Sequence, residues 1–288
     1  MVEHLHLPGS DAVRLHVARR GDHGPLLIFL HGFPECWMAW HRQLDSFGGD
    51  CRAVAPDLRG YNLSDKPEGT QSYGLSRVAA DIAALIRALS PDAPALVVGH
   101  DWGGLTAWYL AQHYRPLVSR LVVINAPHPA LFGRELRTNP LQVLASTYVA
   151  AFQVRRLAEY ALRARSFALL RAMVWGLSTR AEAFSDGLQQ AYREAWAQPG
   201  ALPAGLAYYR NAENIRLLLS APAGWHTDVP TLVLWGDLDP ALRPGNLRRL
   251  HTIVRTLTIR RHAACTHWIV HEEPDWVDAR IRDHMTKM

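Results

Sequence analysis

The chain has 288 residues, of which 49% are hydrophobic, so it can bury one large core or one core with an inserted subdomain. Its formal net charge is +5, but the basic residues are scattered along the chain, and 29 of the 31 are arginine. Scattered charge of this kind predicts a solvated surface and argues against a nucleic-acid-binding role.

The sequence also bears on the cellular compartment. The cysteines, Cys36, Cys51 and Cys265, are too few and odd in number to predict a disulfide framework. The N-terminal residues contain no apolar segment typical of a secretory signal. The longest uncharged run, residues 138–154, carries several polar side chains, so we expect no membrane span there. These features together predict a cytoplasmic protein.

Hydrophobic patterning in the first part of the chain predicts a sheet that begins antiparallel and continues parallel. Short alternating segments at 4–7 and 13–17 precede a dense apolar strand at 25–30. Strands and helices then alternate, which is typical of a parallel sheet with crossover helices. The later segments are a strand at 54–56, a helix at 76–89, a strand at 93–99, a helix at 103–114 and a strand at 120–125.

This alternation stops after residue 127. From there to 220 the patterns are helical, including 157–175 and 181–196, with no strand between them. We predict that 128–220 form an inserted helical cap and that 1–127 and 221–288 form the core. In the core, the sheet pattern resumes at 230–235, continues through 243–251 and 254–259, and ends with a helix at 274–285.

One strand-to-helix junction has the layout of a nucleophile elbow. The strand in ALVVGHDWGG stops at Asp101, with Gly99 and Gly103 in the flanking positions that a strained, exposed turn requires. This pattern predicts an α/β-hydrolase fold with a carboxylate nucleophile. A glycine-rich turn with a helix-capping aspartate is the alternative interpretation.

A second apolar strand ends in the sequence HGFP. In this fold that loop lies beside the elbow and supplies a backbone N–H to the oxyanion hole, so Phe33 and Trp102 are the expected donors. The side chains of Phe33 and Trp102 are then free to line the pocket, although aromatic residues there are also compatible with ordinary core packing. The expected substrate contacts are His31, Pro34, Trp102 and Trp268.

An acid and a histidine follow the nucleophile in the order that the fold requires. The strand in TLVLWGDLDPAL ends with two acids, of which we favour Asp239 over Asp237 as the partner of the histidine. Near the C-terminus, we favour His267 over His262 and His271 because it lies in the CTHW turn before the final helix.

The motifs HGFPECWMAW, DLRGYNLSDKP, GHDWGG, NAPHP and WGDLDPAL together resemble the soluble epoxide hydrolases of the α/β-hydrolase superfamily, over nearly the whole chain. In the cap, STYVAAFQ and LAYYRN resemble the segments that carry the family's epoxide-binding tyrosines. The resemblance implies these roles for Tyr148 and Tyr209, with Tyr208 left open as an alternative register. Thr266 departs from the family, which usually has glycine before the catalytic histidine.

The resemblance implies a two-step reaction without a metal or cofactor. Asp101 attacks an epoxide carbon while the two phenols bind the epoxide oxygen, and an ester forms. Water activated by His267, with Asp239 behind it, then hydrolyses the ester to release a vicinal diol. The expected partners are a small apolar epoxide and water. The sequence does not indicate the oligomeric state.

Other functions use the same scaffold. Haloalkane dehalogenases share the His-Asp-Trp elbow but bind a halide through N–H donors, and Trp175 and Trp196 in the cap keep this hypothesis open. Fluoroacetate dehalogenases place arginine after the nucleophile, where this chain has Trp102. An ordinary esterase would need serine or cysteine at the elbow. A non-catalytic ligand receptor is a remote alternative, since every catalytic role is filled here.

Overall fold

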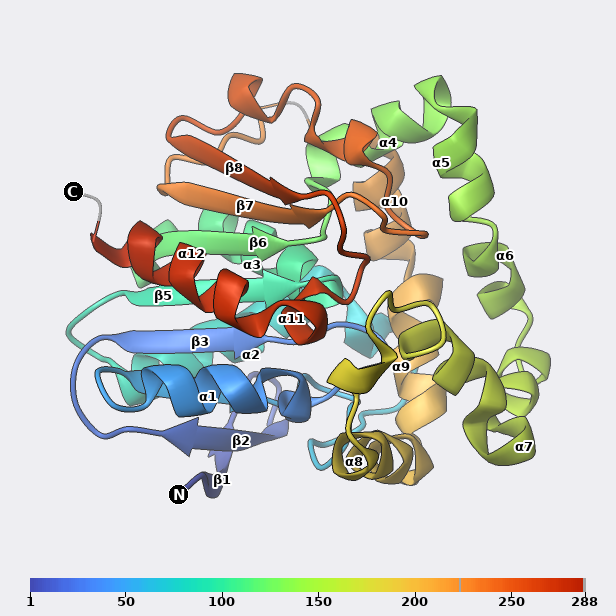
Figure 1. Ribbon diagram of the computed structural model, residues 1–288, viewed down its shortest axis with the longest axis horizontal. Coiled ribbons are helices and arrows are strands. Elements are labelled where there is room, and N and C mark those ends of the chain that lie inside the picture. Colours follow the sequence, from blue (N-terminus) through green and yellow to red (C-terminus); the bar gives the residue numbers. More distant parts are fainter. Residues whose placement is uncertain (223, 287–288) are drawn as a thin grey trace.

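Figure 1 shows the computed structural model of the chain, which describes residues 1–222 and 224–286. Its centre is an eight-stranded sheet with the order β1-β2-β4-β3-β5-β6-β7-β8. The first two pairs in this order are antiparallel, and the remaining neighbours are parallel. The strands are Glu3–Pro8 (β1), Arg14–Arg20 (β2), Leu26–Leu30 (β3), Arg52–Pro56 (β4), Ala95–His100 (β5), Val118–Ile124 (β6), Thr231–Gly236 (β7) and Leu257–His262 (β8).

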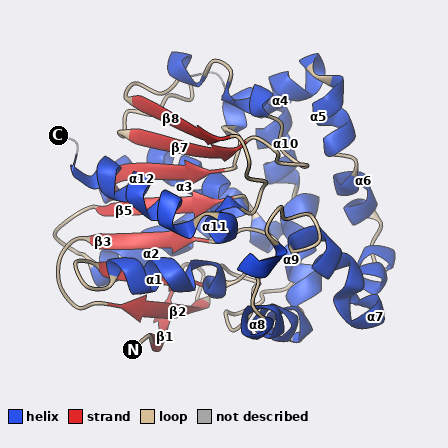
Figure 2. Cartoon of the chain, in the orientation of Figure 1, coloured by secondary structure: helices blue, strands red, loops and turns tan. Residues whose placement is uncertain are grey.

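Helices cover both faces of this sheet, which confirms the predicted α/β fold class (Figures 1 and 2). Helices α1, α11 and α12 lie on one face, and α2 and α3 lie on the other. The flanking helices are His41–Phe47 (α1), Leu75–Leu89 (α2), Trp102–His113 (α3), Ile269–Glu272 (α11) and Pro274–Thr286 (α12). Short 3-10 helices at Trp37–Trp40, Thr70–Tyr73 and Arg115–Leu117 complete this part of the chain.

The sheet separates two apolar layers. Leu27 and Phe29 of β3 pack with the layer beneath α1 and α12, whereas Ile28 packs with the layer that includes α2 and α3. Because successive side chains of a strand point to opposite faces, a strand covered on both faces must be apolar throughout. All residues of β3, β5 and β7 are buried accordingly.

The chain between β6 and β7 is helical and lies over the carboxyl ends of the parallel strands (Figure 1). The first helix of this segment, α4, packs against its last helix, α10, so the segment leaves and rejoins the sheet at one place. The helices are Pro129–Thr138 (α4), Pro140–Ala145 (α5), Tyr148–Gln153 (α6), Leu157–Val174 (α7), Ala181–Ala183 (η4), Asp186–Ala197 (α8), Ala201–Arg210 (α9) and Ala212–Ser220 (α10).

Two predictions about individual elements were wrong. Residues 243–251 do not continue the regular alternation but form two short 3-10 helices, Pro244–Leu247 and Leu250–Thr252, separated by Arg249 in a left-handed conformation. The helix expected from 181 starts only at Asp186, because the Ser185 side chain accepts a hydrogen bond from the Leu188 backbone and caps the helix there.

Helix α7 covers most of the predicted 157–175 helix, but it is interrupted. Ala164 has an extended ψ of 147°, and Arg165, Ser166 and Phe167 have φ values of 51°, 53° and 61°. Positive φ is unfavourable for residues with a Cβ, so two helical pieces meet here at a kink. Within the described ranges, none of the helices combines the length and the apolar character needed to cross a membrane.

Candidate active site

Asp101 lies in the sharp turn that joins β5 to α3. Its φ of 52° and ψ of −119° lie outside the regions that residues with a Cβ normally occupy, so the turn is strained. The turn also needs small neighbours, since a Cβ on Gly103 would lie 2.1 Å from the carbonyl oxygen of Leu30. This geometry is that of a nucleophile elbow, which presents one side chain above the sheet.

The Asp101 carboxylate lies within reach of the predicted oxyanion-hole donors. The backbone N–H of Phe33 donates a hydrogen bond of 2.8 Å to its Oδ1. Burial raises the pKa of Asp101, while His267 and the backbone N–H groups of Phe33 and Trp102 act in the opposite direction. The loop after β3 and the start of α3 therefore direct two N–H groups at the same carboxylate.

His267 lies between the two predicted carboxylates. Its Nδ1 is 2.7 Å from Oδ2 of Asp239, and its Nε2 is 3.6 Å from Oδ2 of Asp101. Burial lowers the pKa of His267, but the charges of Asp239 and Asp101 outweigh that effect and raise the pKa to about 9. Asp237 instead pairs with Arg261, 2.7 Å away, so the structure brings Asp239 and not Asp237 to the histidine.

Asp239 is held rigidly at the end of β7. Its Oδ1 accepts hydrogen bonds of 2.8 Å from the backbone N–H groups of both Ala241 and Leu242, and its Oδ2 accepts one of 2.7 Å from Asn125. These contacts and His267 lower the pKa of Asp239 despite its burial. Asn125 was not among the site residues predicted from the sequence, although it begins the NAPHP motif directly after β6.

A cavity of about 420 Å³ opens beside Asp101 beneath the helices of the inserted segment. Tyr148 of α6 and Tyr209 of α9 both line it, with ring centroids 6.1 Å apart. Tyr208 also lines it, but its hydroxyl donates to the backbone oxygen of Arg59 at 2.8 Å. The remaining lining is mostly apolar: Trp102, Leu105, Pro127, Phe132, Leu136, Ser146, Val149, Ala150, Gln153, Asn214, Ile215, Leu218, Leu219 and Leu242.

Comparison with known proteins places this site in a family. Residues 25–274 match the family model of the alpha/beta hydrolase fold. The chain is 38% identical to the AB hydrolase superfamily protein YfhM of Bacillus subtilis, over 96% of each chain. It is 34% identical to epoxide hydrolase 4 of Mus musculus, over 94% of this chain and 76% of that protein. The chain belongs to the epoxide hydrolase family of α/β hydrolases.

Solved structures agree with this membership. The epoxide hydrolase of Bacillus megaterium in complex with an inhibitor matches with a TM-score of 0.91 and 34% identity, over 98% of this chain and 100% of that one. An epoxide hydrolase of Vigna radiata matches with a TM-score of 0.83 and 26% identity, over 100% and 99% of the two chains. The α/β-hydrolase fold and the family expected from the sequence are both confirmed.

Of the four predicted substrate contacts in this family member, the structure places only Trp102 in the cavity lining. His31 is fully buried, and its Nε2 accepts a hydrogen bond of 3.0 Å from the Leu58 backbone. The indole of Trp268 donates to the backbone oxygen of Met173 at 3.0 Å. Pro34 lines a separate small cavity. The ring nitrogens of His31 and Trp268 are already used in hydrogen bonds, so these two side chains support the loops around the site.

A buried carboxylate that was not predicted from the sequence lies beneath the site. Glu35 follows the HGFP loop, and its two oxygens lie 2.8 Å from Nδ1 of His100 and 2.9 Å from Nε2 of His271. His100 continues the chain of contacts through its Nε2, which lies 2.9 Å from the backbone oxygen of His267. Both histidines hold the pKa of Glu35 well below its usual range despite burial. Glu35 therefore ties the elbow and the His267 loop together.

The close approach of the HGFP loop to the elbow gives a first prediction. A Cβ added to Gly32 would lie 2.3 Å from Cβ and 2.5 Å from Oδ1 of Asp101. We expect Gly32→Ala to displace the carboxylate and lower turnover of an epoxide by at least about 100-fold, since small misplacements of reacting groups are costly. Gly49→Ala is the matched control, because its Cβ would meet no atom within 4 Å. Equal rates in the two variants would contradict this account.

Proposed function

We propose that the protein hydrolyses an uncharged, apolar epoxide to a vicinal diol through a covalent ester on Asp101. The observation that carries this proposal is the shared cavity of one carboxylate and two phenols, Asp101, Tyr148 and Tyr209. A carboxylate can attack saturated carbon without a base, and phenols can donate to an epoxide oxygen. Relatives and structural neighbours named epoxide hydrolases support the same activity.

In the first step, a carboxylate oxygen of Asp101 attacks one epoxide carbon, and the bond from that carbon to the epoxide oxygen breaks. Tyr148 and Tyr209 donate hydrogen bonds to this oxygen as it gains negative charge, and one of the two phenols transfers its proton to it and becomes a tyrosinate. Burial and the nearby charge of Asp101 raise the pKa values of both phenols, so the phenols are protonated at neutral pH. The products are an alcohol and an ester on Asp101.

In the second step, water attacks the carbonyl carbon of this ester while His267 accepts a proton from the water. Asp239 orients the ring and stabilises the imidazolium that forms. The N–H groups of Phe33 and Trp102 stabilise the oxyanion. The ester bond breaks, and the leaving alcohol oxygen takes the proton from His267 to complete the diol. The acid proton left on Asp101 returns to the tyrosinate, so Asp101 regains its carboxylate and one water is consumed for each epoxide.

The charge on Asp101 controls His267 during this cycle. The Asp101 carboxylate is one of the groups that raise the pKa of His267 to about 9, and this charge disappears in the ester. The pKa of His267 should therefore be lower in the ester, which converts the residue into a base. We expect the rate of ester breakdown to rise about tenfold per pH unit below the pKa that His267 has in the ester, and to be independent of pH above that pKa. Rapid-quench kinetics across the pH range would measure the rate of ester breakdown. A rate that does not change with pH would contradict the role of His267.

The tyrosine pair gives a further prediction. Changing both Tyr148 and Tyr209 to phenylalanine removes the donors to the epoxide oxygen, and we expect ring opening to fall by at least about 1,000-fold. Tyr160→Phe is the matched control, because Tyr160 is 74% exposed and lies outside the cavity lining. Pre-steady-state formation of the ester is the measurement. An unchanged rate in the double variant would exclude the pair as proton donors and favour dehalogenation.

The dehalogenase hypothesis has less support from the geometry. A halide site needs a second N–H donor besides Trp102, and Trp196 instead donates its indole N–H to the backbone oxygen of Pro34 at 2.5 Å. Trp175 stacks on Trp196, with ring centroids 5.6 Å apart, and neither ring lines the cavity beside Asp101. The deciding assay compares styrene oxide with 1-bromobutane. Diol without bromide supports the proposal, and bromide without diol overturns it.

We further propose that residues 128–220 act as the cap of the site, because they supply both tyrosines and most of the apolar lining. The lining contains no basic side chain among the described residues, so an uncharged epoxide with an aryl or alkyl tail fits better than a fatty-acid epoxide with a free carboxylate. We propose the cytoplasm as the compartment, since Cys36, Cys51 and Cys265 are all free thiols.

A further inference from the structure

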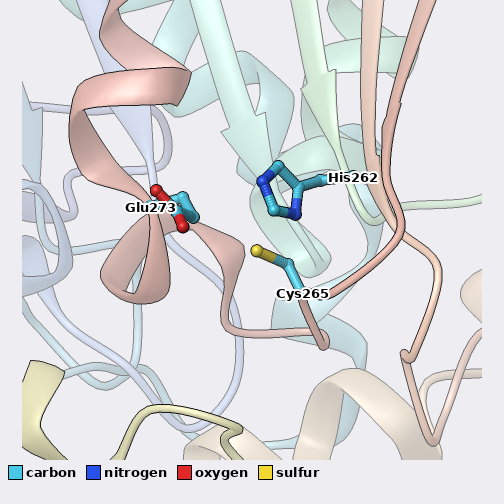
Figure 3. A group of neighbouring side chains, drawn as sticks. All are labelled: His262, Cys265 and Glu273. Atoms are coloured by element: carbon cyan, nitrogen blue, oxygen red, sulfur yellow. The ribbon is translucent and has the colours of Figure 1, made fainter.

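Three potential metal ligands meet at the edge of the sheet, outside the cavity beside Asp101. They are His262 at the end of β8, Cys265 in the turn that follows, and Glu273 between α11 and α12 (Figure 3). One donor atom from each lies within 4.8 Å of the other two. We propose that these side chains bind one thiophilic divalent cation such as Zn²⁺.

The donor set matches the chemistry of such a cation. Imidazole, thiolate and carboxylate are the three ligand types of protein zinc sites, and three protein ligands leave a fourth tetrahedral position for water. Zinc bonds of about 2.0 to 2.3 Å place neighbouring ligand atoms about 3.5 Å apart. The three side chains would need to close by roughly 1 Å, which rotations about their own bonds can provide.

One donor nitrogen is buried without a hydrogen-bond partner in the described part of the chain, and the neighbouring thiol is not in a disulfide. Nδ1 of His262 is buried and makes no hydrogen bond within the described part of the chain. Trp276 packs against the ring edge-on, with centroids 5.3 Å apart, and restricts its orientation. Cys265 is buried and forms no disulfide, and its thiol has a hydrogen bond with the Glu272 side chain. A buried nitrogen without a partner is costly unless something binds it, and a cation beside the thiol would do so.

The third donor is partly engaged, and the local charge favours a cation. Glu273 forms an ion pair with Arg180 through Oε1, which leaves its second carboxylate oxygen available. Glu272 stands beside Glu273 and adds a second negative charge near the Cys265 thiol. Glu272 itself is occupied by hydrogen bonds from Thr266, so it positions the turn and is not counted as a ligand.

The site is separate from the proposed chemistry. None of the three ligands lines the cavity beside Asp101, and the proposed hydrolysis has no step that uses them. The inference therefore does not depend on the epoxide hydrolase proposal, and its test measures binding rather than turnover.

Co²⁺ is the probe, because it can occupy the same site as Zn²⁺ and its absorption spectrum depends on the ligands that bind it. We expect titration of the purified full-length protein with Co²⁺ to show one bound ion per chain, visible bands of a tetrahedral centre and a near-ultraviolet thiolate-to-cobalt band. One equivalent of Zn²⁺ should abolish these bands. Cys265→Ser should remove the thiolate band, whereas Cys51→Ser, which changes another buried free cysteine, should keep it.

His262→Gln and Glu273→Gln test the other two ligands. We expect each to weaken Co²⁺ binding by at least about tenfold, because loss of even an indirect partner of a metal ligand costs that much. Thermal unfolding of each variant checks that the fold is intact. A thiolate band that survives Cys265→Ser would overturn the proposal. Cobalt bands without a thiolate component in the unmodified protein would also overturn it, since they would place the ion on histidines elsewhere.

Discussion

Replacing Asp101 with alanine is expected to abolish epoxide turnover, by a factor on the order of 10⁴ or more. The carboxylate is the only group at the elbow that can form the ester, and the backbone N–H of Phe33 is directed at it from 2.8 Å. The loss should not come from misfolding. Asp101 is buried with a raised pKa, so removing its charge relieves a desolvation cost, and the melting temperature should not fall.

An oxygen label separates this mechanism from direct attack by water. In a single turnover of the unmodified protein in H₂¹⁸O, the diol should contain no ¹⁸O, because its new oxygen comes from Asp101. The label should appear in the carboxylate of Asp101, as a mass increase on the peptide that carries this residue. An ¹⁸O-labelled diol in the first turnover, or full activity of Asp101→Ala, would remove Asp101 from its proposed role.

Replacing His267 with glutamine is expected to stop the reaction at the ester. Ring opening requires only Asp101 and the tyrosines, so it should proceed, whereas water is no longer activated. Glutamine retains a side-chain amide near Asp239, which lies 2.7 Å from Nδ1 of the native ring. The expected result is denatured protein in which the peptide carrying Asp101 is heavier by the mass of the substrate.

The charges around Asp101 determine the pH at which the His267→Gln variant should be tested. His267 lowers the pKa of Asp101, so its removal raises that pKa further, and the reaction should be run at mildly alkaline pH to keep the carboxylate ionised. The double variant Asp101→Ala with His267→Gln is the control and should carry no adduct. Turnover without an adduct in His267→Gln would assign the base to another residue. His100 would be the first candidate, since its ring lies 4.6 Å from that of His267.

Local sequence patterns predicted most of the fold. The strands β3, β5 and β7 are predominantly apolar because helices cover both faces of the sheet, and this pattern is visible without a structure. The boundaries in 243–251 were not predictable in the same way. There the chain is held in short 3-10 turns, with Arg249 left-handed, and no periodic pattern marks them.

Choices between adjacent residues required the structure. Asp237 and Asp239 both follow β7, two positions apart, and their contacts differ: Asp237 pairs with Arg261, whereas Asp239 pairs with His267. Tyr208 and Tyr209 are neighbours on α9, and the helix directs the hydroxyl of Tyr208 to the Arg59 backbone.

By itself, the sequence determined the sheet, the turn at Asp101 and the predicted order of nucleophile, acid and histidine, because these depend on local periodicity and on motifs of adjacent residues. Only the tertiary structure decided which side chains meet, such as Glu35 with two distant histidines and Asn125 with Asp239. It also placed His31, Pro34 and Trp268 outside the cavity lining. Such contacts join residues far apart in the chain, and their hydrogen-bonding partners are set by packing, which no local pattern encodes.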